Sequence, residues 1–472
     1  MRSVLTRPRA SAGEQKTPGR WLLLAGLGAF AVALGLYVIY TVIHPKSFTM
    51  DPVDLAVYRS GGLIVRHVRP LYDPRLAAPL YDWVGYGKLH LPFTYTPFAA
   101  ITFAVISFVP WWLSQQLSVA VDILALLTAL WLTLGGLGYR KDKTRLAVTL
   151  LGAAAVFWTE PVLRTMYLGQ VNLVLMALII WDLCQPDTRP GTGKSRWWKG
   201  FGTGIAAGIK LVPLVFIPYL LLAGKFRQAA MACAGFAFTV LLGFVILPGD
   251  SGKWWFHGLF FQGGRTGFTG WAGNQSLDGL ITRLTGSING ARPAWIAAAV
   301  LVGVTGLIAA ALLDRKGYQV PGLLMAALTG LLVSPLSWDH HWVWVAPGIA
   351  LLAHLGAAAA SRLVRAAWWA AAAGLFLVFA CWPQFWNLSQ AGLTPAGLGW
   401  YAPGSYFATG SKPWYHEFHW HGLQLLAGNS FVLAGLAGLA ALTVAALLPV
   451  VTGRLAAGQP RGRPGEPREL SP

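Results

Sequence analysis

The chain has 472 residues, of which 55% are hydrophobic and only 11% are charged, and its mean hydropathy is +0.54. A soluble protein would carry about 25% charged residues, so a soluble enzyme is excluded. The net charge is +19, but the basic residues form short clusters between long apolar runs. This distribution favours the positive-inside pattern of a membrane protein over binding to a polyanion. We therefore expect the lipid bilayer, and no nucleic acid, as a partner.

Placing each basic cluster in the cytoplasm predicts the membrane spans in chain order. They are 21–43, 113–137, 146–159, 168–184, 229–247, 294–313, 319–335, 342–358, 366–382 and 427–449. The first run is too long for a signal peptide and lacks an A-x-A cleavage pattern. The prediction is an all-α, polytopic protein with about 10–13 membrane helices, in which 1–20 is a cytoplasmic tail, 21–450 is one membrane domain and 451–472 is a disordered cytoplasmic tail.

Two apolar segments do not read as simple spans. Phe98 to Val109 is too short to cross, which predicts an interfacial or re-entrant helix. In 200–224, basic clusters flank both ends while Lys210 and Pro213 interrupt the middle. This pattern predicts two half-helices that meet near Lys210, because a broken helix is tolerated in a membrane only where it lines a cavity in the protein.

Three long loops, roughly 44–96, 248–293 and 383–425, are left on the outer face and hold most of the remaining polar residues, so we expect the active site there. Asp54 follows the first span, where the membrane boundary would partly desolvate a carboxylate and suit it as a general base. An ordinary loop or capping aspartate is the simpler interpretation, and Asp51 is a rival.

Further along the chain, a polar group separates two predicted spans. It comprises Glu160, Arg164, Tyr167, Gly169, Gln170 and Asn172. Ionisable residues at membrane depth are costly unless they are paired or functional. Glu160 and Arg164 are four residues apart, so a structural ion pair and a role in substrate binding are both open. Lys210 needs an anionic partner, for which a lipid phosphate is suitable, although snorkelling to a headgroup is an alternative.

Two later motifs offer groups that bind sugars or phosphates. Asn274 and Gln275 carry amides of the kind that bind sugar hydroxyls, although turn chemistry alone would also select this motif. Asp339, His340 and His341 resemble part of a metal site, but no further ligand has motif spacing to them. The three cysteines, Cys184, Cys233 and Cys381, have no motif spacing either. We therefore predict no metal and no cofactor.

Taken together, six stretches in one order resemble glycosyltransferase family 87, the actinobacterial polyprenol-phosphate-mannose-dependent alpha-mannosyltransferases of the GT-C class. The stretches are Asp54-Leu55-Ala56-Val57-Tyr58, Leu91-Pro92-Phe93-Thr94-Tyr95-Thr96-Pro97, Gly169-Gln170-Val171-Asn172, Ala206-Ala207-Gly208-Ile209-Lys210, Gly273-Asn274-Gln275-Ser276-Leu277 and Ser334-Pro335-Leu336-Ser337-Trp338-Asp339-His340-His341-Trp342. The resemblance implies that mannose moves, with inversion, from polyprenyl-phosphate mannose to a lipid-linked or cell-envelope glycan acceptor on the outer face.

The resemblance also implies that Asp54 is the catalytic base. A cation near the donor phosphate would offset the charge that develops there, and we expect Lys210 and Arg164 in that role. Substrate binding is expected of Tyr58, Tyr95, Glu160, Gln170, Asn172, Asn274, Gln275, His340 and His341. Thr96 departs from the family, in which a second proline is common. A transporter or flippase of lipid-linked sugars is the alternative, but we find none of the paired repeats that such proteins tend to show.

Overall fold

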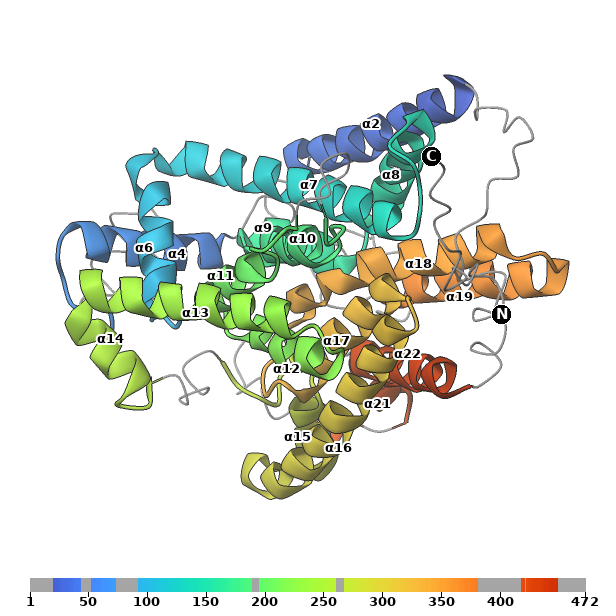
Figure 1. Ribbon diagram of the computed structural model, residues 1–472. Helices are drawn as coiled ribbons and strands as arrows, with labels where there is room; N and C mark the ends of the chain where they lie inside the picture. Colours follow the sequence, from blue (N-terminus) through green and yellow to red (C-terminus); the bar gives the residue numbers. More distant parts are fainter. Residues whose placement is uncertain are drawn as a thin grey trace, which may run out of the picture.

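The computed structural model describes residues 20–43, 52–73, 92–188, 195–259, 267–380, 417–420 and 422–448. In these ranges the regular structure is helical, and the only β-type pairings are two isolated bridges. The helices pack as one bundle (Figure 1), which confirms the all-α prediction. Asp51, Cys381, the predicted tails and most of the predicted loop 383–425 lie outside the described residues.

Seven of the described helices are long and apolar enough to cross a membrane. They are α2 (Arg20–Ile43), α7 (Trp111–Gly136), α13 (Phe226–Ile246), α16 (Ile288–Arg315), α18 (Val345–Ala358) with the preceding 3-10 turn η5 (Asp339–Trp344), α19 (Arg362–Ala380) and α22 (Ser430–Leu447). The pair α8 (Lys143–Val156) and α9 (Glu160–Leu168) meets the same test as one broken span. The polytopic character predicted from hydropathy is thereby confirmed.

Shorter helices complete the bundle. They are α4 (Val53–Arg66), α6 (Pro97–Phe103), η1 (Ala104–Phe108), α10 (Asn172–Leu183), α11 (Phe201–Ile209), η2 (Val212–Val215), α12 (Phe216–Leu222), α14 (Pro248–Trp255), α15 (Leu277–Thr285), α17 (Gln319–Val333), η9 (Glu417–His419) and α21 (Leu423–Gly428). Two predicted spans, 168–184 and 319–335, correspond to α10 and α17, which have 12 and 15 residues. Both are largely buried inside the bundle.

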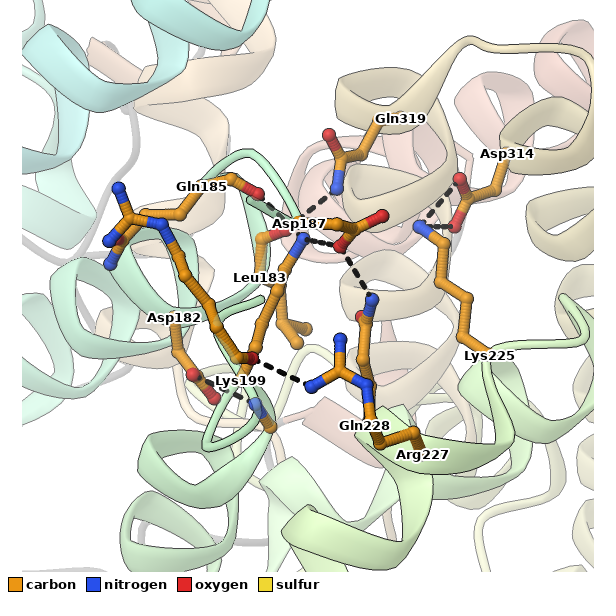
Figure 2. Close-up of polar contacts among 12 residues, drawn as sticks. Asp182, Leu183, Gln185, Asp187, Lys199, Lys225, Arg227, Gln228, Asp314 and Gln319 are labelled. Atoms are coloured by element: carbon orange, nitrogen blue, oxygen red, sulfur yellow. Dashed lines mark hydrogen bonds and ion pairs between the residues drawn. The ribbon is translucent and has the colours of Figure 1, made fainter. Parts of the chain in front are cut away.

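The bundle has two chemically different ends. We call one the basic end, because it carries Lys199, Lys225 and the ends of α10 and α16 (Figure 2). There the side chain of Gln319 donates to the carbonyl oxygen of Leu183 at 2.6 Å. The opposite end, where α10 begins at Asn172, we call the site end.

Helices α11 and α12 form the broken pair that the sequence predicted. α11 ends at Ile209, Lys210 is extended, and the chain resumes as η2 and α12. Before α11, Lys199 donates to Asp187, and after α12, Gln228 donates to the same carboxylate. The chain therefore enters and leaves this pair at the basic end and reverses direction at Lys210.

Close packing against α13 fixes the α11 half of the pair. A Cβ on Gly204 would lie 2.2 Å from the carbonyl oxygen of Ala232, and one on Gly235 would lie 2.3 Å from that of Phe201. Gly200 has a φ of +107° and would also collide with Gln228. Only glycine fits at these positions, so the glycines of this segment hold α11 against α13.

The predicted boundaries differ from the structure most around the polar group at 160–172. The chain does not run straight from one span into a loop, because α8 and α9 meet at 79°. Thr159 and Pro161 start α9, in keeping with the preference for proline in the first helical turn. α16 also begins earlier than predicted, at Ile288, because the side chain of Ser287 accepts a hydrogen bond from the Gly290 amide.

Candidate active site

Asp54 lies in the first turn of α4. Gly62 lets α4 pack closely against α6 and η1, since a Cβ on it would lie 2.6 Å from the carbonyl oxygen of Phe103, and Gly61 packs against Phe93 in the segment before α6. No hydrogen bond or ion pair joins the Asp54 carboxylate to another described side chain, yet its charge acts on Tyr58, Tyr95 and Lys210. An unpaired carboxylate with these neighbours is suited to accept a proton.

A network of two phenols and an amide lies beside Asp54. The hydroxyl of Tyr58 donates to Oε1 of Gln170 at 2.5 Å and lies 3.1 Å from the hydroxyl of Tyr95. Burial, followed by the charges of Tyr95 and Asp54, raises the pKa of Tyr58 well above its ordinary value. Tyr58 therefore stays neutral near pH 7 and donates its proton, whereas the hydroxyl of Tyr95 accepts from Nε2 of Gln170 at 3.4 Å. The structure thus brings together three residues that the sequence predicted for the site.

Gly169 brings the turn between α9 and α10 against α4. It has a φ of +67°, and a Cβ on it would lie 2.6 Å from Cβ of Leu55, the residue after Asp54. The left-handed conformation ends α9 in the usual way for a C-terminal glycine. The turn then places Gln170 beside Tyr58 and Asn172 at the start of α10.

Lys210 meets the first turn of α10 and the η5 segment at the break between α11 and η2. Its ammonium donates to Oδ1 of Asn172 at 2.8 Å and lies 2.9 Å from Nε2 of His341. Asn172 in turn donates to the carbonyl oxygen of His340 at 2.9 Å, which fixes the orientation of its amide. An ammonium has three N–H donors, and among the described residues Lys210 has two acceptors.

Glu160, Arg164 and Asp339 form a second group of ionisable side chains in the site. Glu160 is completely buried, and its carboxyl group interacts with that of Asp339. Its nearest charges are those of Asp339 and Arg164, but no ion pair within 4.0 Å joins it to Arg164. The structural ion pair, one of the two roles that the sequence left open for Glu160 and Arg164, is therefore not formed. Arg164 stacks on Tyr167 at 5.1 Å.

The two histidines have different partners. His340 Nδ1 lies 2.9 Å from Oδ1 of Asp339, whereas His341 contacts Lys210. Their carbonyl and side-chain contacts connect η5 to α10 and to the end of α11. The motif at 339–341 therefore connects three elements of the site.

Asn274 and Gln275 lie apart from this group and bond to backbone. Oδ1 of Asn274 accepts from the amide of Ser337, and its amide nitrogen donates to the carbonyl oxygens of Thr269 and Pro335. Gln275 donates to the carbonyl oxygen of Gly428 and accepts from two backbone amides of α22. Both side chains are fully buried. They fix the segment that leads into η5, and the sequence prediction that they contact the sugar finds no direct support in this geometry.

Three supporting residues were not predicted as site residues. Thr96 caps α6 by accepting from the Ala99 amide and also donates to the carbonyl oxygen of Gly208, two residues before Lys210. Thr165 donates to the carbonyl oxygen of His340 at 3.2 Å. Tyr72 donates to the carbonyl oxygen of Tyr95 at 2.7 Å. Of these three residues, only Thr96 stood out in the sequence, because it replaces a proline that is common in the family.

Comparison with known proteins identifies the family. The model of glycosyltransferase family 87 matches residues 93–335, about half of the chain. The chain belongs to this family. No solved structure matches it significantly.

Two curated relatives come from Mycobacterium tuberculosis. The chain is 33% identical over 341 residues, 72% of its length and 74% of the relative's, to a polyprenol-phosphate-mannose-dependent alpha-(1-2)-phosphatidylinositol pentamannoside mannosyltransferase. It is 34% identical over 350 residues, 71% of its length and 77% of the relative's, to a polyprenol-phosphate-mannose-dependent alpha-(1-2)-phosphatidylinositol mannoside mannosyltransferase. A pentamannoside mannosyltransferase of Mycolicibacterium smegmatis is 33% identical over 371 residues, 74% of this chain and 85% of its own.

Proposed function

We propose that this glycosyltransferase moves mannose from polyprenyl-phosphate mannose to a hydroxyl of a lipid-linked or cell-envelope glycan acceptor, with inversion at the anomeric carbon. The donor in the names of the curated relatives supports this assignment. The observation that carries the proposal is the position of Lys210. This cation lies at the break between two half-helices, and its described hydrogen-bond partners are the amide of Asn172 and the imidazole of His341. A monoanionic or dianionic phosphate supplies the counter-charge that these two partners lack.

Lys210 is proposed to bind the donor phosphate with its third N–H. His341, which accepts from the ammonium only when Nε2 carries no proton, orients the lysine and presents its Nδ1 proton elsewhere. Fixed donors near a leaving phosphate lower the barrier because they meet the charge that develops as the glycosidic bond breaks. Arg164 is proposed as the second cation near the phosphate. Its charge also acts on Glu160 and Asp339.

Asp54 is proposed as the general base. The acceptor oxygen attacks the anomeric carbon, the bond from that carbon to the phosphate oxygen breaks with its electron pair going to the phosphate, and the hydroxyl proton passes to Asp54. Direct displacement of this kind inverts the anomeric centre. The charges of Asp54 and Lys210 act on each other, so one substrate can reach both. Tyr58, Tyr95, Gln170 and Asn172 are the proposed substrate contacts near these two residues. Asn274 and Gln275 are proposed to act through the segment that they position.

The decisive experiment uses the purified protein in lipid vesicles with labelled polyprenyl-phosphate mannose and phosphatidylinositol-mannoside acceptors. The wild type should form a mannosylated product, whereas a transporter would move the donor without forming one. Asp54→Asn keeps the size of the side chain but cannot take a proton, so we expect turnover to fall about a thousandfold. Asp51→Asn is the matched control. Normal turnover in the Asp54 variant, or loss confined to the Asp51 variant, rules Asp54 out.

The side of the membrane is a separate part of the proposal. Basic residues mark the cytoplasmic end of a membrane protein, so we place both termini in the cytoplasm and the site end outside. In a cysteine-free background, Arg69→Cys, at an exposed position three residues after α4, should react with an impermeant thiol reagent in intact cells. Ser195→Cys at the basic end should react only after lysis. The opposite labelling pattern would reverse this orientation.

A further inference from the structure

Glu160 and Asp339 form a buried pair of carboxyl groups in the site. Glu160 is the first residue of α9 and Asp339 is the first residue of η5, and only 0% and 3% of their surfaces are exposed. Their side chains are in hydrogen-bond contact. No lysine or arginine nitrogen lies within 4.0 Å of either carboxyl group among the described residues. Two carboxyl groups in contact cannot both be ionised without a cation between them, so the pair holds a proton.

The other hydrogen bonds of Asp339 indicate which member of the pair carries the proton. Oδ1 of Asp339 accepts from the backbone amide of His340 at 2.6 Å and lies 2.9 Å from Nδ1 of the same residue. Donors of this kind favour the ionised form of a carboxyl group. Apart from its contact with Asp339, neither oxygen of Glu160 has a hydrogen-bond partner among the described residues. Glu160 is therefore the donor and Asp339 the acceptor.

The groups around α9 supply no cation in place of this proton. Arg164, one turn along the same helix, stacks on the ring of Tyr167 and forms no ion pair with Glu160. Besides η5, the helices α4, α7, α10 and α19 pack against α9. The charged groups that act on Glu160 are Asp339 of η5 and Arg164 of α9 itself, and none comes from these four helices.

Asp339 holds the start of η5 in place through His340. The backbone amide and the ring of His340 both contact its carboxylate. The carbonyl oxygen of His340 accepts from Thr165 of α9 and from Asn172 of α10. The segment is thus fixed from both sides, immediately before the histidine that contacts Lys210.

From these contacts we infer that Glu160 is a positioning residue that stays protonated and donates a hydrogen bond to Asp339, which keeps η5 in the geometry needed for transfer. This inference rests on the proposed function, because η5 matters for transfer only if His341 orients Lys210 toward the donor phosphate. Loss of the proton would place two like charges in contact and turn Asp339 away from His340. Glu160 thus acts on the substrate through η5 and not by touching it.

Two substitutions test the need for a donor at this position. Glu160→Gln keeps the size of the side chain, and its amide can donate to Asp339 without a titratable proton. We expect its kcat to stay within about threefold of that of the wild type. Glu160→Met has a similar length but no donor, so we expect kcat to fall about tenfold or more with little change in the acceptor KM. A large loss of kcat in the glutamine variant, or normal kcat in the methionine variant, overturns the inference.

Asp122→Asn is the matched control for the loss of a buried carboxyl group. Asp122, on α7, is 1% exposed, and one of its carboxyl oxygens also has no hydrogen-bond partner among the described residues. It lies near Tyr37 of α2 and takes no part in the hydrogen bonds that hold η5. We therefore expect normal kcat in this variant.

Infrared spectroscopy tests the proton directly and needs neither donor nor acceptor. In protein whose glutamates carry carbon-13 in the side-chain carboxyl group, the wild type should show the C=O stretch of a protonated glutamate at neutral pH. This band should be missing from Glu160→Gln and kept in Asp122→Asn. The measurement also decides the question if the methionine variant does not fold.

The infrared result separates this inference from the proposed function. If the protein transfers no mannose but the band assigned to Glu160 is present, the proposed function fails and the protonated pair stands. If transfer occurs and the spectra of the wild type and of Glu160→Gln show no difference in this band, the inference fails alone.

Discussion

The same kinds of charged residue occur at both ends of the bundle, but their partners differ. At the basic end Lys199 pairs with Asp187 at 3.0 Å and Lys225 pairs with Asp314 at 2.6 Å (Figure 2). At the site end the hydrogen-bond partners of Lys210 among the described residues are an amide and an imidazole, and no carboxylate pairs with it within 4.0 Å.

Two carboxylates, Asp182 and Asp54, differ in the same way. At the basic end Asp182 accepts three hydrogen bonds, from the amides of Gly200 and Thr203 and from the hydroxyl of Thr203. At the site end Asp339 is paired with His340, whereas the carboxylate of Asp54 has no hydrogen-bond donor among the described residues and its charge acts on Lys210. Charges that complete their pairs inside the protein hold helix ends together, whereas a charge left without a counter-charge is costly to the fold and is kept for a ligand.

Exchanging lysine for methionine at the two ends should give opposite results. We expect Lys210→Met to lower kcat/KM for the donor at least tenfold, about 1.4 kcal/mol, with little change in the acceptor KM and in stability. Lys225→Met is the matched variant and should keep the donor KM but lower the melting temperature, because it leaves Asp314 buried without its cation, at a cost of about 1–3 kcal/mol. Steady-state kinetics and thermal unfolding in detergent measure both. The comparison fails if Lys210→Met affects only acceptor kinetics, or if both variants lose stability equally.

Thr96 tests how precisely the site end must be held. Thr96→Val keeps the volume but removes the cap of α6 and the hydrogen bond to Gly208. We expect a several-fold loss of kcat, roughly 1 kcal/mol, because the α11 end that carries Lys210 loses its tie to α6. Thr96→Ser should restore most of the activity. Normal kcat in the valine variant would show that this hydrogen bond does not position Lys210.

The smallest expected effect concerns pH at the basic end. Burial alone would raise the pKa of Asp187, but the hydrogen bond from Lys199 and the charges of Lys199, Lys225 and Arg227 outweigh it and lower the pKa below its ordinary value. A lowered folded-state pKa contributes stability above the unfolded value of about 4, and this contribution is lost as the pH falls through the folded-state pKa.

Because Asp187 is 64% exposed, solvent screening limits the gain to less than about 1 kcal/mol. Asp187→Asn should therefore lower the melting temperature slightly at pH 7 and not at pH 2. Thermal unfolding across this range checks the sign. A larger deficit of the variant at the acid end would contradict the assignment.

The sequence predicted the break at Lys210 because two basic clusters flanked an interrupted apolar run, so charge and hydropathy agreed. It did not predict the 79° bend between α8 and α9, since hydropathy treats a bent pair and a straight span alike. It also placed Asn172, Lys210 and His341 in one site only through the family resemblance. Their contacts join residues 38 and 131 positions apart, and no local pattern encodes such pairing.

Asn274 is a residue whose role the sequence alone could not decide. An amide in a glycine-containing turn has the chemistry to bind a sugar, and the sequence cannot tell whether its hydrogen bonds go to a ligand or to neighbouring backbone. In the structure they go to Thr269, Ser337 and Pro335. Buried side-chain amides are usually hydrogen-bonded within the protein. The position of Asn274 in a predicted outer loop was therefore weak evidence that it binds a sugar.

The reversal at Lys210 also affects how the chain enters the membrane during synthesis. A segment with a central lysine, which costs about 2.5–3.5 kcal/mol at the middle of a helix, inserts poorly by itself, so the pair α11 and α12 must wait for α10 and α13 to shield it. The chain enters and leaves this pair at the same end of the bundle. Late insertion of α11 and α12 into the bilayer therefore does not change the side of the membrane on which any following helix begins. The charged centre of the enzyme can thus be installed after the surrounding helices without disturbing the order of the rest of the chain.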